Sequence, residues 1–428
     1  MKLENIIDIV KASGADAWEI TDTREEGWEF YFIRKKLDQN RAKLVEHIRA
    51  TVYKKSEDGQ FLGSASGGIA PTASEDEVRH VVEGLLKNAA YVRNPFYTLN
   101  RPTETAAPAA EEDVDPAAIA KDFIEAVRGV PETATEDINS WELFVSKKQR
   151  RFVNSEGIDV VSVFPASMVE VVVNARRDDH EIELYRLYKS GGCDRETLVR
   201  DISETLKYGK DKLITRNTPN LGKADVVFST DAALEIYDWF AARMNAALKA
   251  RGLSDWEVGK DVVEGATGDR VTLTAVPNLP NSSRNAAYDA EGAPVRETAL
   301  IENGVAKRFL GNRQFSQYLG LDESFQPGNL VVAGGTATAD ELRTGRFLEA
   351  VEFSDFQVNP MNGDIAGEIR LAYWHDGDTV TPVSGGSITG TMAEFAKTMR
   401  MSRETRQYDC RVIPAVTRLE GVTVTGAM

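Results

Sequence analysis

Few residues of this sequence have the chemistry of a metal site. Four histidines occur; His180 follows Asp178-Asp179 and His375 precedes Asp376, so each could supply half of a ligand set. A catalytic zinc ion needs three protein ligands and an open position for water. No second histidine lies at ligand spacing from either residue, and aspartate-rich turns are typically solvated. We therefore expect neither histidine to bind a metal.

Carboxylates offer a different route to hydrolysis, in which an acid and a base act without a metal. The candidates are Asp289, Glu291, Asp355 and Asp364. The first two lie in an Asp-Ala-Glu-Gly sequence that is also typical of a turn with a capping aspartate. A hydrolase that uses these carboxylates is therefore an alternative hypothesis.

The two cysteines, Cys193 and Cys410, are too few for a disulfide framework. Cys410 stands in a Tyr-Asp-Cys-Arg sequence beside an expected strand. A lone cysteine beside a strand is typical of a small core residue. We therefore expect Cys410 to lie in the core.

Composition narrows the class of protein. The chain has 428 residues and a formal net charge of −16. Binding to a phosphate backbone needs a basic face, so this charge argues against a nucleic-acid partner. No stretch approaches the ~20 consecutive apolar residues of a membrane-spanning helix. We expect an acidic cytoplasmic protein with no nucleic-acid or membrane partner.

The order of the expected helices and strands along the chain, which must position these candidate residues, predicts an α+β fold. We expect a mixed α/β N-terminal domain over residues 1–222 and a β-rich C-terminal domain over residues 223–428, with an extensive antiparallel sheet. Helices are expected at the N-terminus and over residues 74–90, 116–128 and 195–207, and Ser74-Glu75-Asp76-Glu77 has the pattern of a capping box at the start of the second. Residues 101–115 are rich in Pro, Ala, Thr and Glu, which predicts a mobile linker.

The start of the C-terminal part predicts a strand, a helix and a hairpin. Residues 224–229 are typical of a buried strand, and Thr230 or Asp231 could cap a helix that continues to about residue 250. Asn303-Gly304 separates two β-tolerant runs, which is a strong signal of a hairpin with a two-residue turn.

Four sequence blocks between Ala224 and Met428 resemble, in order and spacing, the signatures of the TldD/PmbA family, whose members were once called modulators of DNA gyrase. The first is an Asp-x-Glu-Gly-x-Pro sequence followed by an Asn-Gly turn, at Asp289, Glu291, Gly292, Pro294, Asn303 and Gly304. The second is an Asn-Pro-x-x-Gly-Asp sequence at Asn359, Pro360, Gly363 and Asp364. The remaining two are Pro382–Gly390 and Leu419–Gly426.

This resemblance implies the scaffold of a peptidase. TldD-like members carry an H-E-x-x-x-H zinc motif on a helix and a cysteine ligand nearer the C-terminus, whereas PmbA/TldE-like members are companion subunits without the motif. In this chain the corresponding helix contains no histidine, and Tyr237 and Asp238 stand where the motif would begin. The resemblance therefore implies a pseudoenzyme that has no catalytic residues and no zinc of its own.

The resemblance also implies the partners. A PmbA/TldE-like chain would join a TldD-like catalytic subunit that holds the zinc, or form a homodimer, and the substrate of the system would be a peptide. An alternative within the same fold is a stand-alone protein that binds extended peptides by adding them to a sheet edge.

Overall fold

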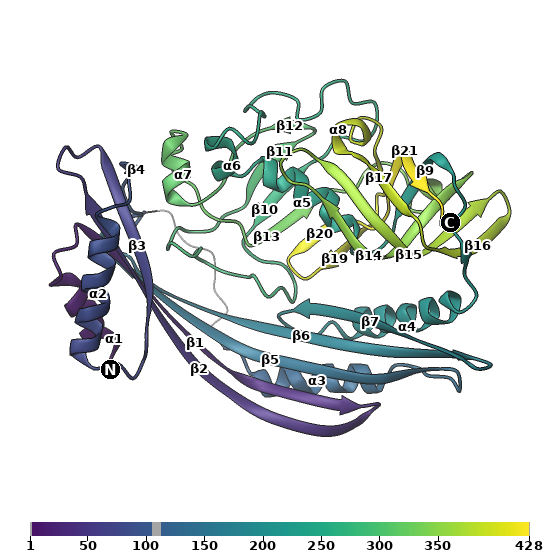
Figure 1. The fold of residues 1–428 in the computed structure, drawn as a ribbon, viewed down its shortest axis with the longest axis horizontal. Coiled ribbons are helices and arrows are strands. Elements are labelled where there is room, and N and C mark those ends of the chain that lie inside the picture. The colour runs from purple at the N-terminus through teal and green to yellow at the C-terminus, as the bar shows by residue number, and fades with distance from the viewer. Residues whose placement is uncertain (1, 105–112, 428) are drawn as a thin grey trace.

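The computed structural model describes residues 2–104 and 113–427. The first half of the chain forms one seven-stranded antiparallel sheet, in the order β4-β3-β2-β1-β5-β6-β7, whose long strands curve beneath the second half (Figure 1). The bounds are β1 (Ala17–Ile33), β2 (Lys36–Lys55), β3 (Phe61–Ile69), β4 (Asn94–Pro95), β5 (Glu136–Asn154), β6 (Asp159–Arg177) and β7 (His180–Ser190).

Helices pack on two separate parts of this sheet. The bounds are α1 (Leu3–Lys11), α2 (Glu75–Ala89), α3 (Pro116–Arg128) and α4 (Arg195–Lys212). The first two cover β1, β2 and β3, and the other two lie side by side on β5 and β6. The predicted capping box is present, because the Ser74 hydroxyl accepts a bond from the Glu77 N–H and the Glu77 carboxylate accepts one from the Ser74 N–H.

The second half contains two further sheets. A six-stranded sheet has the order β12-β11-β10-β13-β20-β19, and an eight-stranded sheet has the order β14-β9-β21-β17-β15-β16-β8 with β18 paired to β21. Since β14 also pairs with β15, the strands β14, β9, β21, β17 and β15 form a closed ring. The largest apolar core lies between these sheets and the helix α5.

The strand bounds here are β8 (Arg216–Asn217), β9 (Gly222–Phe228), β10 (Leu273–Val276), β11 (Thr298–Glu302), β12 (Val305–Ala306), β13 (Asn329–Val332), β14 (Phe347–Val358), β15 (Asp364–Asp376), β16 (Thr379–Ser384), β17 (Ser387–Thr391), β18 (Arg400–Met401), β19 (Thr405–Tyr408), β20 (Arg411–Pro414) and β21 (Thr417–Thr425). The helices are α5 (Ala233–Arg243), α6 (Ala246–Ala250), α7 (Arg313–Tyr318), α8 (Met392–Phe395) and the 3-10 turn Glu341–Arg343. The predicted α+β class with extensive antiparallel sheet is confirmed.

One predicted helix is wrong in its bounds and its cap. The segment expected to run to residue 250 is two helices, α5 and α6, and α5 begins after Ala232 without a side-chain cap from Thr230 or Asp231. The break has a local cause. Asn245 is extended and caps α6 through Ala247 N–H, while Ala246 N–H donates to Leu310 O, so the backbone pairs with a neighbouring segment instead of continuing the helix.

Other expectations concern boundaries. Most of the predicted linker, residues 105–112, lies outside the described residues; Val114 is buried and the Asp115 side chain caps α3. The division at residue 222 stays a prediction about folding units, and the short strand β8, which precedes it, already pairs with β16. Within the part of the chain that the structure describes, no helix combines the length and apolarity needed to cross a membrane.

Candidate functional site

A cavity of about 660 Å³ lies between the two halves of the molecule. Its walls come from β7 and α4 in the first half, and from the start of α5 and the strands β19 and β20 in the second. Because no single half encloses it, its shape depends on how the two halves are held together. We call it the β7–β19 cavity.

The β7–β19 cavity lies along the edges of two sheets. β7 is the last strand of the seven-stranded sheet, and β19 is the last strand of the six-stranded sheet. Five consecutive residues of β7, 186–190, and all four residues of β19, 405–408, line the cavity. Since neighbouring side chains of a strand point to opposite faces, such unbroken runs mean that the cavity follows the strand edges rather than the sheet faces.

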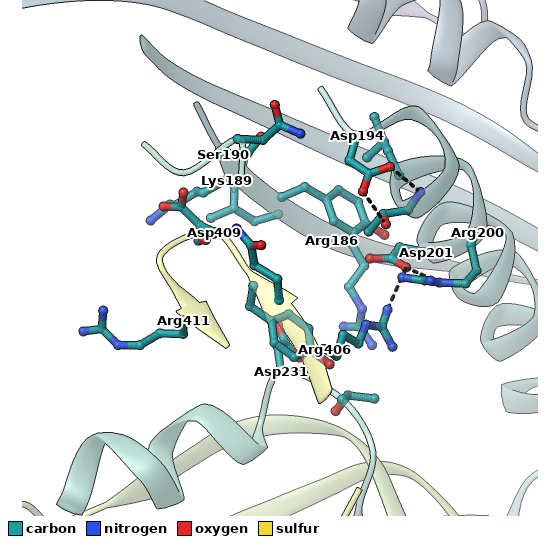
Figure 2. Close-up of a pocket in the computed structure, with 18 of the residues that line it drawn as sticks. Arg186, Lys189, Ser190, Asp194, Arg200, Asp201, Asp231, Arg406, Asp409 and Arg411 are labelled. Carbon is teal, nitrogen blue, oxygen red and sulfur yellow. Dashed lines mark hydrogen bonds and ion pairs between the residues drawn. The ribbon is translucent and has the colours of Figure 1, made fainter. Parts of the chain in front are cut away.

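Ion pairs join the two halves across this cavity. Arg406 of β19 reaches α4, where its Nη2 lies 2.7 Å from Asp201 Oδ1 and 3.5 Å from Glu204 Oε2. In Figure 2, Arg406 points toward Asp201, whereas Arg411 lies on the other side of the β19–β20 hairpin. Glu352 of β14 similarly accepts Arg186 of β7 at 3.4 Å. Both pairs are partly buried, so salt screens them less than it screens exposed pairs.

Only one of the two residues at the expected motif position, Asp238, faces the β7–β19 cavity. Tyr237 is fully buried, its hydroxyl lies 2.7 Å from Thr417 Oγ1, and burial raises its pKa. Asp238 lines the β7–β19 cavity, and its Oδ1 accepts a bond of 2.9 Å from Arg411 Nε. A metal-binding histidine at position 237 would therefore face the core rather than solvent.

The donors at this position do not fit a zinc ion. Asp238 is neutralised by Arg411, Tyr237 is a phenol held at its unusually high pKa, and Ala242, one turn beyond Asp238, has no donor atom. Among residues 2–104 and 113–427, no three His, Cys, Asp or Glu side chains are grouped as metal ligands would be.

The expectation that Cys410 lies in the core is wrong. Cys410 is half-buried and lines the β7–β19 cavity. Its Sγ lies 3.2 Å from Arg411 Nη1. Burial raises the pKa of the Cys410 thiol despite the neighbouring guanidinium, so the neutral thiol dominates at neutral pH.

The two histidines considered as metal ligands lie apart from this cavity. His180 is exposed at the start of β7. His375 stacks on Phe347 with ring centroids 4.1 Å apart, and its Nε2 lies 3.5 Å from Glu349 Oε2. Burial lowers the pKa of His375. His180 is therefore a surface residue, and His375 packs within the fold through Phe347 and Glu349.

The Asp-x-Glu-Gly-x-Pro block forms the joint between the two halves. Asp289 accepts backbone N–H bonds from Glu291, Ala293 and Gln326, each 2.9 Å long, so it caps a turn. Pro294 bridges to Tyr288 on the other side of that turn. This is the turn-capping role that the sequence left open beside a catalytic one.

Contacts from this turn reach the long strands of the first sheet. Arg150 of β5 donates to the Asp289 carbonyl at 2.9 Å. Gly292 has φ +74°, and a Cβ at this position would lie 2.7 Å from the Ile158 side chain and 3.0 Å from that of Phe152. Only glycine lets the turn approach the sheet this closely.

One buried carboxylate, that of Asp289, and two half-buried carboxylates, those of Glu19 and Glu291, meet in this joint. Glu291 accepts a bond of 2.7 Å from Arg313 N–H, and burial, reinforced by Asp289 and Glu19, raises its pKa to about 8. Burial also raises the pKa of Glu19 and of Asp289, although the Tyr53 hydroxyl donates to Glu19 at 2.7 Å. Asp355 and Asp364 are instead exposed on β14 and β15, so the four candidate carboxylates do not form one site.

The remaining motif residues shape turns. Asn303 and Gly304 have φ of 46° and 74°, which confirms the two-residue turn between β11 and β12. Asn359 caps its own turn by accepting the Met361 N–H at 2.9 Å, and Gly363 N–H donates to Asn359 O. Asp364 accepts a bond from the Asn362 amide, and Pro360 is exposed. These residues support the scaffold rather than the cavity.

Sequence reasoning missed the residues that line the cavity. No local pattern indicates that Arg411 meets Asp238, because 173 positions separate them. The signal that was available is the arginine directly after Cys410, which places a cation beside the one cysteine near the C-terminus.

Residues 221–426 match the family model of the PmbA/TldA metallopeptidase C-terminal domain. A metalloprotease PmbA homolog of Haemophilus influenzae is 23% identical over an alignment of 252 residues that covers 54% of this chain and 51% of that protein. A zinc metalloprotease TldD homolog of Saccharolobus solfataricus is 21% identical over an alignment of 237 residues that covers 50% of each chain. This chain thus spans about half the length of the curated relatives it matches.

Solved structures share the whole fold. TldE from Thermococcus kodakarensis matches with a TM-score of 0.75 and 17% identity over 100% of both chains. A candidate modulator of DNA gyrase from Bacteroides thetaiotaomicron matches with a TM-score of 0.78 and 15% identity, over 99% of this chain and 98% of that one. At these identities the structures establish the fold, and the family model establishes that residues 221–426 form a C-terminal domain of the PmbA/TldA metallopeptidase type.

Proposed function

We propose that this chain is a PmbA/TldE-like subunit of a TldD/TldE-type zinc metallopeptidase system, and that it binds peptide without hydrolysing it. The observation that carries the proposal is the ion pair of Asp238 with Arg411. The Arg411 guanidinium holds the Asp238 carboxylate in this ion pair, so the carboxylate is not a free ligand for zinc, and a guanidinium does not activate a water molecule as zinc does.

The β7–β19 cavity supports a peptide as the ligand. An extended peptide can add to a free sheet edge through main-chain hydrogen bonds, which do not depend on its sequence. β7 offers such an edge over 11 residues and β19 over 4, and both line the same cavity. The apolar walls, which include Leu187 and Tyr408, would contact alternate side chains of the peptide.

Within this proposal, zinc and hydrolysis belong to a TldD-like partner that carries H-E-x-x-x-H. The test is reconstitution: the purified chain, a TldD-like subunit from the same cell, and their mixture are assayed for cleavage of unfolded peptides with and without a chelator. We expect cleavage by the mixture, loss of it with the chelator, and none by this chain alone. Chelator-sensitive cleavage by this chain alone would refute the proposal.

A stand-alone peptide-binding protein is the second candidate, and one observation favours it. Both sheet edges of the β7–β19 cavity come from this single chain, so no partner is needed to complete the cavity. Affinity purification from the source cell separates the two candidates. Recovery of a stoichiometric partner that carries H-E-x-x-x-H supports the subunit role. Recovery of a homodimer or a lone chain that still binds peptide supports the second candidate.

A further inference from the structure

Arg411 and Asp238 lie where two cavities meet. The β7–β19 cavity is one; the other, about 400 Å³, lies beside α5, α6 and α7, and we call it the α5–α7 cavity. Among residues 2–104 and 113–427, Arg411 and Asp238 are the two that line both cavities. A chain that leaves the β7–β19 cavity in this direction therefore passes the ion pair.

Hydrogen bonds hold the guanidinium of Arg411 in place, but they do not occupy all of its N–H donors. Nε donates to Asp238 Oδ1, and Nη1 donates to Gly328 O at 3.0 Å and to Cys410 O at 3.3 Å. Within the part of the chain that the structure describes, Nη2 has no hydrogen bond. Asp238 occupies only one N–H of a group that is able to bind a carboxylate with two.

Asp238 holds this position loosely. Its side chain is 46% exposed, compared with 25% for Arg411, so it can turn to solvent at little desolvation cost. An incoming carboxylate could then take Nε together with Nη2, which is the side-on bidentate arrangement of arginine and carboxylate.

The α5–α7 cavity has room beyond this point. Its walls are formed largely by small residues and side-chain amides: Ala241, Ala242, Ala247, Gly311, Asn245, Asn312 and Gln326. A final side chain of a peptide could occupy this space while its carboxylate stays at Arg411. The space lacks a second cation among the residues that line it, so Arg411 alone would provide the charge.

We infer that Arg411 binds a carboxylate of the peptide that lies in the β7–β19 cavity, and this inference rests on the proposed function. Asp238 competes for the same donors and so keeps the site neutral when no peptide is present. The carboxylate belongs either to the C-terminus of the peptide or to an acidic side chain, which share the same chemistry.

The test compares three fluorescein-labelled hexapeptides by fluorescence anisotropy on the full chain. They are Ala-Val-Thr-Val-Ala-Val as the free acid, the same peptide amidated, and an amidated version with glutamate as the last residue. The variants are Arg411→Gln, Asp238→Asn and, as a matched control, Arg346→Gln, which removes an arginine that pairs with Asp376 at 2.8 Å and lines neither cavity. Thermal melting verifies that each variant is folded.

We expect the free acid to bind at least about ten-fold more tightly than its amide, as for a charge-assisted hydrogen bond. Arg411→Gln should abolish this ratio, Arg346→Gln should keep it, and Asp238→Asn should increase it because the competitor is neutral. Tight binding of the glutamate amide would assign the site to acidic side chains as well. Equal binding of all three peptides to the natural chain, or an unchanged ratio in a folded Arg411→Gln or Asp238→Asn variant, overturns the inference. If no peptide binds at all, the proposed peptide-binding function itself fails.

Discussion

Gly363 packs directly against Trp239, because a methyl group at position 363 would lie 3.1 Å from the indole Nε1. Trp239 belongs to α5, the helix that carries Asp238, and its ring meets that of Trp256 edge-on at 5.4 Å. Arg243 lies over both rings and donates to the Met361 carbonyl at 2.8 Å. The Asn-Pro-x-x-Gly-Asp turn therefore holds α5 in place beside the cavities.

Replacing Gly363 by alanine should destabilise the protein by about 1–3 kcal/mol, since φ is +77° and the new methyl group would press on Trp239. Urea unfolding followed by tryptophan fluorescence measures the change. Gly345→Ala is the matched control, because φ is +79° there but no described residue beyond its chain neighbours lies within 4 Å of the new Cβ. An equal loss in both variants would mean that the contact with Trp239 contributes nothing beyond backbone strain.

Gly304→Val should destabilise the hairpin by roughly 1 kcal/mol or more, because φ is +74° and valine is branched at Cβ. The valine would also displace Arg270, whose Nε would lie 2.7 Å from the new Cβ and now donates to Asn303 O. Chemical denaturation measures the loss. A variant as stable as the natural protein would show that the turn readily adopts another form.

The joint between the halves should make stability depend on pH. Glu291 has a pKa of about 8 in the folded protein and an ordinary value of 4.5 when unfolded. The folded state therefore holds the proton more tightly between these values, so the free energy of unfolding should fall as pH rises from 4.5 to 8, by up to about 1.4 kcal/mol per pH unit. Glu291→Gln cannot ionise and should flatten this slope.

Glu19 and Asp289, whose pKa values burial also raises, should leave a smaller slope in the Glu291→Gln variant. Glu297→Gln, which alters an exposed carboxylate of the same segment, is the control and should keep the natural slope. Unfolding curves between pH 5 and pH 8 provide the measurement. A Glu291→Gln profile parallel to the natural one would exclude Glu291 as the cause.

Local signals in the sequence predicted local structure well. The capping box at Ser74 and the Asn303-Gly304 turn depend on residues within a few positions of one another, and both are confirmed. The helix of residues 233–250 was misjudged because its break comes from backbone pairing with Leu310, sixty-odd positions away in sequence. Helix propensity depends on the local sequence and contains no information about a partner so distant in sequence.

The cavity was beyond prediction for the same reason. Its walls, β7 and β19, are ordinary strands by pattern, and only the order of strands in each sheet makes them edges. The motif residues Asp289 and Glu291 were visible in sequence, but their burial against Glu19 was not, so a structural joint could not be distinguished from a catalytic pair.

The chain by itself should purify with substoichiometric zinc, and neither chelator nor Cys410→Ser should change its metal content. One equivalent of tightly held zinc in the natural chain, lost on Cys410→Ser, would instead mean that the protein holds a metal centre of its own.

The geometry also predicts how a zinc site could be built. Asp238 and Ala242 are four residues apart in α5 and both line the α5–α7 cavity, so Asp238→His with Ala242→His would present two imidazoles on one side of the helix near Cys410. We expect this pair to bind zinc poorly while Arg411 remains, because its positive charge repels the ion, and to bind it tightly once Arg411→Ala is added. Zinc titration with a colorimetric chelator distinguishes the variants.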